Sequence, residues 1–71
     1  MIQPETTQYI RIRVTADAAS FVGTPAERAA YLRGRAEKRE AQAEASANVA
    51  YAAIDRAVAA EYRAKAEEVA A

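Results

Sequence analysis

The strongest constraint on the fold of this chain is the near absence of helix-breaking residues after residue 24. No proline follows Pro25, and Gly34 is the single glycine between that point and Ala71. Alanine, glutamate, arginine, glutamine and lysine make up most of this stretch, and all five favour helices. The tetrad Thr24-Pro25-Ala26-Glu27 supplies a helix start, with an N-cap threonine, a proline in the first turn and a glutamate that completes a capping box. The sequence therefore predicts a long helix over residues 24–70.

A helix of this length needs a packing partner, because an average globular helix has about 11–12 residues. A packing seam can be traced in steps of three, four and four residues, and this period predicts straight or slightly right-handed packing. The alternative is a helical hairpin, in which Ser46-Ala47-Asn48 ends one helix and caps a second that begins at Val49. No glycine or proline marks a turn there, so the unbroken helix is the preferred interpretation. The seam consists of Ala29, Leu32, Ala36, Glu40, Ala43, Ala47, Tyr51, Ile54, Val58, Tyr62, Lys65 and Val69.

The N-terminal part of the chain has a different pattern, which predicts a β-strand over residues 7–14. Apolar side chains alternate there with polar or aromatic ones, as in a half-buried strand. A lone strand leaves its backbone donors and acceptors unpaired, so it needs a strand from a second copy or from another protein. Residues 15–22 are predicted to form a short helix that Gly23 ends. The expected fold is mainly α, with one N-terminal strand, a short helix and a long C-terminal helix or hairpin, in an intertwined homodimer. The inward set of the strand is Ile10, Ile12 and Val14, and the outward set is Tyr9, Arg11 and Arg13.

Large hydrophobic side chains are scarce in this chain, which favours association. Of the 71 residues, 21 are alanine and 11 are leucine, isoleucine, valine or phenylalanine. Burial of so few large side chains offsets the entropy of ordering the backbone only narrowly. A second copy or another protein would supply the missing apolar contacts. The predicted dimer or partner interface consists of Ile10, Ile12, Val14, Tyr51, Ile54, Val58 and Tyr62.

The amino-acid composition argues against an enzyme. The chain contains neither cysteine nor histidine, so it lacks thiol nucleophiles, zinc–thiolate sites and the commonest general base. We therefore expect no catalytic residue, no metal or cofactor site and no small-molecule substrate. The longest apolar run is far shorter than the ~20 residues that cross a bilayer, and the N-terminus lacks the pattern of a signal peptide. The expected location is the cytoplasm.

Charges balance over the whole chain but not within each part of it. There are 10 basic and 10 acidic side chains, with basic residues predominating in 11–39 and acidic residues in 40–71. An antiparallel neighbour would pair these opposite charges. Overall neutrality disfavours DNA binding, because affinity for a duplex comes largely from a basic face that neutralises phosphates. The candidate contacts for nucleic acid or for an acidic partner are Arg11, Arg13, Arg33, Arg35 and Arg39.

The predicted strand, followed by helices, resembles the ribbon-helix-helix family of DNA-binding repressors. In that family two strands pair across a dimer axis and their outward side chains enter the major groove. The resemblance covers residues 7–14 and implies that Tyr9, Arg11 and Arg13 face DNA. A ribbon-type DNA-binding regulator is therefore an alternative function.

In size and composition the whole chain resembles the small early proteins with which phages inhibit host regulators or machinery, including anti-quorum-sensing and anti-pilus inhibitors. That resemblance implies steric capture, in which one face of the protein covers a surface of a host protein. The preferred hypothesis is thus a non-catalytic, homodimeric protein-binding module. A structural component of a phage particle is a further alternative.

Overall fold

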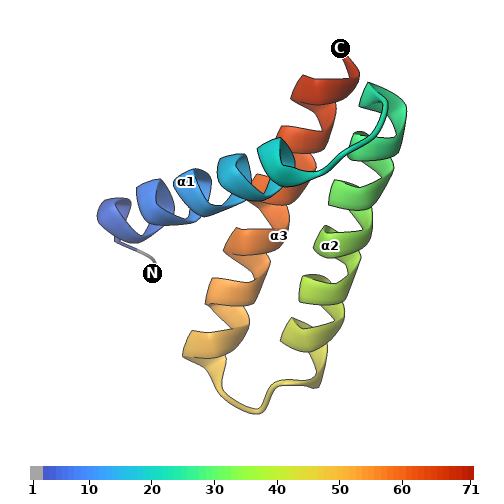
Figure 1. Cartoon of the computed structure of the whole chain (residues 1–71). Coiled ribbons are helices and arrows are strands. Elements are labelled where there is room, and N and C mark those ends of the chain that lie inside the picture. The colour runs from blue at the N-terminus through green and yellow to red at the C-terminus, as the bar shows by residue number, and fades with distance from the viewer. Residues whose placement is uncertain (1–2) are drawn as a thin grey trace.

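The computed structural model of the protein describes residues 3–71 and contains three α-helices in that range (Figure 1). They are α1 (Pro4–Ser20), α2 (Pro25–Ala45) and α3 (Val49–Ala70). Helices α2 and α3 form an antiparallel hairpin, and α1 crosses one face of it (Figure 1). The prediction of a mainly α fold is correct, whereas two of the predicted elements are not.

The prediction of an N-terminal strand is wrong. Residues 7–14 lie inside α1, which also includes most of the predicted short helix 15–22. Ile10 and Val14 are four residues apart, and Ala18 continues the same spacing, so these three side chains form one helical face and are all buried. Ile12 lies off this face and is 61% exposed. Residues 3–71 thus offer no strand for exchange between copies, and the intertwined dimer built on such a strand has no structural support.

The prediction of one continuous helix over residues 24–70 is also wrong. Helix α2 ends at Ala45 and α3 begins at Val49, as in the hairpin alternative. The turn contains no glycine or proline, and hydrogen bonds between side chains and the backbone stabilise it instead. The Ser46 hydroxyl accepts a hydrogen bond from the Asn48 N–H at 3.2 Å, and the Asn48 carbonyl oxygen Oδ1 accepts one from the Tyr51 N–H at 3.0 Å. Asn48 is therefore the N-cap of α3.

The start of α2 agrees with the capping box that the sequence predicts. The Thr24 hydroxyl accepts a hydrogen bond from the Glu27 N–H at 3.1 Å, and the Glu27 carboxylate accepts one from the Thr24 N–H at 2.9 Å. The hydrogen bond from the Thr24 backbone N–H to the carboxylate is the main cause that lowers the pKa of Glu27, and the Thr24 side chain is the second. The cap fixes where α2 begins after the short connection from α1.

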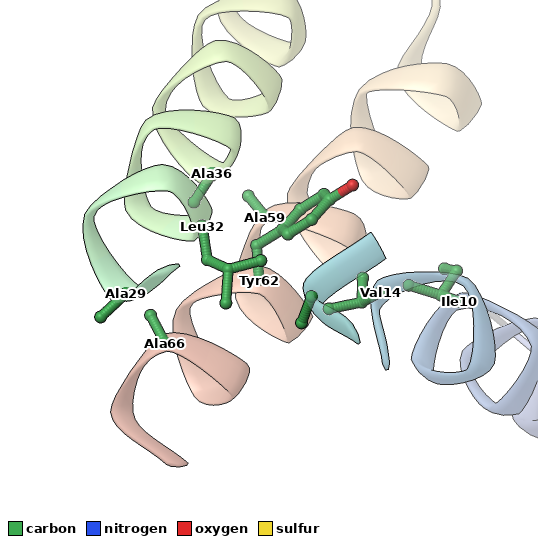
Figure 2. Close-up of a cluster of buried hydrophobic side chains, with 9 residues drawn as sticks. Ile10, Val14, Ala29, Leu32, Ala36, Ala59, Tyr62 and Ala66 are labelled. Atoms are coloured by element: carbon green, nitrogen blue, oxygen red, sulfur yellow. The ribbon is translucent and has the colours of Figure 1, made fainter. Parts of the chain in front are cut away.

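The hairpin is held together by alanines at heptad spacing. The predicted seam includes those of α2 but not those of α3. Each buried alanine of α2 has a counterpart in α3 that lies one residue farther from the turn. Figure 2 shows Ala36 beside Ala59 and Ala29 beside Ala66. Such small side chains let two helices approach closely along their length. The buried alanines of the two helices are Ala29, Ala36 and Ala43 in α2 and Ala52, Ala59 and Ala66 in α3.

Helix α1 covers the half of the hairpin near the C-terminus of α3, where the larger buried side chains gather. Ile10 and Val14 of α1 belong to the same buried cluster as Leu32 of α2 and Tyr62 of α3 (Figure 2). The half of the hairpin near its turn is not covered by α1 (Figure 1). This partial cover leaves a groove between α1 and the hairpin.

Candidate functional site

Asp17 connects all three helices at one end of the groove. Its two carboxylate oxygens accept hydrogen bonds from the Tyr31 hydroxyl of α2 and the Tyr62 hydroxyl of α3, each at 2.9 Å. The Arg35 guanidinium lies 3.6 Å from the same carboxylate. These contacts fix the angle at which α1 crosses the hairpin.

The Arg35 guanidinium also lies between two aromatic rings. Its central carbon is 5.9 Å from the ring centroid of Tyr31 and 5.6 Å from that of Tyr62, within the range of cation–π attraction. The hydrogen bond to Asp17 is the main cause that raises the pKa of Tyr31 above its ordinary value, with burial second. The pKa of Arg35 is also raised, chiefly by its hydrogen bond to Tyr62. Both hydrogen-bond donors thus keep their protons at neutral pH.

A groove of about 590 Å³ opens between α1 and the uncovered face of the hairpin. Apolar side chains from α1 and α3 line its floor, including Ile10, Ile54 and Val58. Tyr9 forms its outer edge and is 59% exposed. Asp17 and Tyr62 line its inner end. The groove combines apolar surface with polar edges, as protein-binding sites do.

Three arginines surround the groove, and they differ in how far their charge is neutralised. Arg39 forms an ion pair with Asp55 at 3.0 Å, and Arg35 shares Asp17 with two tyrosine hydroxyls. Arg13 donates a hydrogen bond to the Tyr9 hydroxyl at 3.0 Å. Among the described residues Arg13 belongs to no ion pair. The groove is therefore basic, and Arg13 is its least compensated charge.

The residues predicted as an interface divide between the core and the groove. Tyr62 and Val14 are buried within the chain, as is Ile10 where it meets the groove floor. Val58 is half-buried, whereas Ile54 and Tyr51 are 38% and 66% exposed. The exposed members of the predicted interface are thus Tyr51 and Ile54 on the first turns of α3, where Ile54 lines the groove, and Ile12 on α1.

The predicted arginine contacts also separate in the structure. Arg13, Arg35 and Arg39 line the groove together. Arg11 lies on the other side of α1, where it pairs with Glu61 of α3 at 3.1 Å. Arg33 is exposed and does not line the groove. Because Arg11 and Arg13 lie on a helix and face different neighbours, they do not form the outward face of a ribbon.

The sequence interpretation missed Asp17 and the hairpin's own charge pairing. Opposite charges pair within the chain across the antiparallel hairpin, between Arg39 of α2 and Asp55 of α3 and between Glu40 of α2 and Arg63 of α3. The hydrogen bonds to Arg63 lower the pKa of Glu40. A carboxylate on the edge of an apolar helical stripe, as Asp17 is beside Val14 and Ala18, was the available signal.

Comparison with known proteins gives no further assignment, since no protein-family model, curated protein or solved structure matches the chain. Within residues 3–71 the acidic side chains form no cluster of three or more that could hold a metal ion. None of the helices in that range combines the length and the hydropathy that crossing a bilayer requires.

Proposed function

We propose that this protein is a non-catalytic protein-binding module whose groove takes up a helical segment of a protein partner. The observation that carries the proposal is an apolar floor left open between α1 and the turn-proximal half of the hairpin, with Ile54 on that floor 38% exposed. A helix laid there would bury Ile54 and Val58 and would complete the cover that α1 begins. Helix-in-groove recognition of this kind uses apolar residues at i, i+3, i+4 and i+7 of the bound helix.

The composition of the groove favours a protein over a nucleic acid. Phosphate binding needs free cationic groups, whereas Arg35 and Arg39 each face a carboxylate of the chain itself. An apolar floor gains nothing from a phosphate backbone but buries apolar side chains well. By covering a helix of a host regulator or machine, such a module would act as a small steric inhibitor.

The proposal is tested by affinity capture from a bacterial lysate with the full-length protein and two matched variants. Ile54→Asp places a charge on the groove floor, and we expect it to abolish retention of the partner. Val49→Asp makes a similar change at a side chain that is 84% exposed and does not line the groove, and it should retain the partner. Circular dichroism checks that both variants stay helical. Equal retention by Ile54→Asp and the unchanged protein would exclude the groove as the binding surface.

A further inference from the structure

The N-terminal half of α1 has the shape and the chemistry of a ligand for the groove itself. In Figure 1 this half extends beyond the hairpin, away from the core. Its outward side chains include Tyr9, 59% exposed, and Ile12, 61% exposed. A helix end that projects from the body with apolar side chains exposed resembles the segment that the groove is proposed to bind.

The charges on this half of α1 are self-complementary. Glu5, Tyr9 and Arg13 follow one another at steps of four residues, so they lie along one side of the helix. Glu5 and Arg13 are exposed, and neither takes part in an ion pair among the described residues. In an antiparallel pair of α1 helices centred on Tyr9, Glu5 of each copy lies opposite Arg13 of the other. Such a reciprocal match is what a twofold interface requires.

The same antiparallel arrangement also brings a negative charge to the basic side of the groove. Arg13, which remains without a carboxylate in the single chain, forms one wall of it, with Arg35 and Arg39 nearby. An antiparallel α1 from a second copy would bring Glu5 to this basic side.

From these observations we infer that the groove is filled by the N-terminal half of α1 from a second copy, in a reciprocal antiparallel dimer. The inference rests on the proposed function in that it takes the groove to be a helix-binding site, and it names the helix. Each copy gives one helix end and receives one, so two grooves are closed by a single twofold contact. A foreign helix would then compete with the second copy for the same surface.

The test is the oligomeric state of the full-length protein and three charge variants, measured by sedimentation equilibrium. The unchanged protein is expected to reach twice the chain mass of 7.7 kDa as its concentration rises. Arg13→Glu and Glu5→Arg each place like charges opposite one another twice per dimer, and each should weaken dimerisation by about tenfold. The double variant Glu5→Arg/Arg13→Glu restores the match with the signs exchanged and should recover the original affinity to within about threefold. Arg33→Glu, on an exposed site outside the groove, is the matched control and should have no effect.

Cysteine cross-linking tests the geometry directly, because the chain has no cysteine of its own. Tyr9→Cys places the thiols of the two copies at the twofold axis, within reach of a disulfide, so mild oxidation should yield a covalent dimer. Val22→Cys, at a position 95% exposed and outside the groove, should not. A monomer at every concentration, a double variant as weak as the single ones, or equal cross-linking at both positions overturns the inference. If the protein is monomeric but Ile54→Asp still loses its captured partner, the inference falls and the proposed function stands.

Discussion

At the scale of single residues, Asp17 has the largest influence on the arrangement of the three helices. It is the one side chain of α1 that is hydrogen-bonded to α2 and to α3 at once, through Tyr31 and Tyr62. Asp17 is half-buried. If its carboxylate were removed, both tyrosine hydroxyls and the Arg35 guanidinium would lose an acceptor that water replaces only in part. No sequence pattern identified these partners, because they lie 14 and 45 residues away along the chain.

We therefore expect Asp17→Ala to lower the free energy of unfolding by about 1–3 kcal/mol, since it removes one carboxylate from several donors. Tyr31→Phe removes a single hydrogen bond and should cost about 0.5–1.5 kcal/mol. Urea unfolding followed by circular dichroism at neutral pH measures both. A loss for Asp17→Ala no greater than that for Tyr31→Phe would show that the carboxylate does not unite the three contacts.

At the scale of helices, the sequence predicted the start of α2 correctly, gave the start of α3 only in the hairpin alternative, and missed the start of α1. The capping box at Thr24 and the side-chain caps at Ser46 and Asn48 are local features, and local hydrogen bonds realise them in the structure. The predicted strand is wrong because the same residues fit two patterns, the alternation of a strand and the four-residue spacing of a helix face. Ile10 and Val14 fit a strand face through Ile12 and a helix face through Ala18, and packing against α3 decides for the helix.

The hairpin shows why the core itself was underestimated from composition. Only large side chains count in the argument from composition, yet Ala36 and Ala66 have no exposed surface at all. At heptad positions on two antiparallel helices, small side chains permit close approach, and the backbones then contribute the packing that large side chains supply elsewhere. The position of the groove could not be predicted from the sequence either. It depends on where α1 crosses the hairpin, and that crossing depends on how closely α2 and α3 approach.

This packing predicts that enlarging a seam alanine is harmful. Ala36→Leu should lower the free energy of unfolding by about 1–3 kcal/mol, because three added carbon atoms must fit between α2 and α3. Ala41→Leu places the same side chain on the exposed side of α2 and should change stability by no more than about 0.5 kcal/mol. Both are measured by urea unfolding. Equal stability of the two variants would mean that the helices can separate at Ala36 without loss.

At the scale of the whole molecule, stability is distributed unevenly over the three helices. The hairpin is joined along its full length by buried alanines and by ion pairs such as Arg39–Asp55. Helix α1 is attached through Ile10, Val14 and Ala18 and through the polar contacts of Asp17. Segments with few buried contacts open locally at a lower free energy than the rest of a protein. Helix α1, which also forms one wall of the groove, is thus the element expected to detach first.

Native-state hydrogen exchange on the dilute protein should resolve this order. We expect the amides of α1 to exchange through an opening that costs less free energy than global unfolding, while amides at the centre of α2 near Leu32 exchange only with global unfolding. Val14→Ala removes two buried carbon atoms from the α1 contact and should lower the opening free energy of α1 by about 1–2 kcal/mol. Because the hairpin keeps its own seam, exchange near Leu32 should change less than exchange in α1. Equal acceleration in all three helices would instead show that α1 and the hairpin unfold as one cooperative unit, and the groove wall would then not open independently of the core.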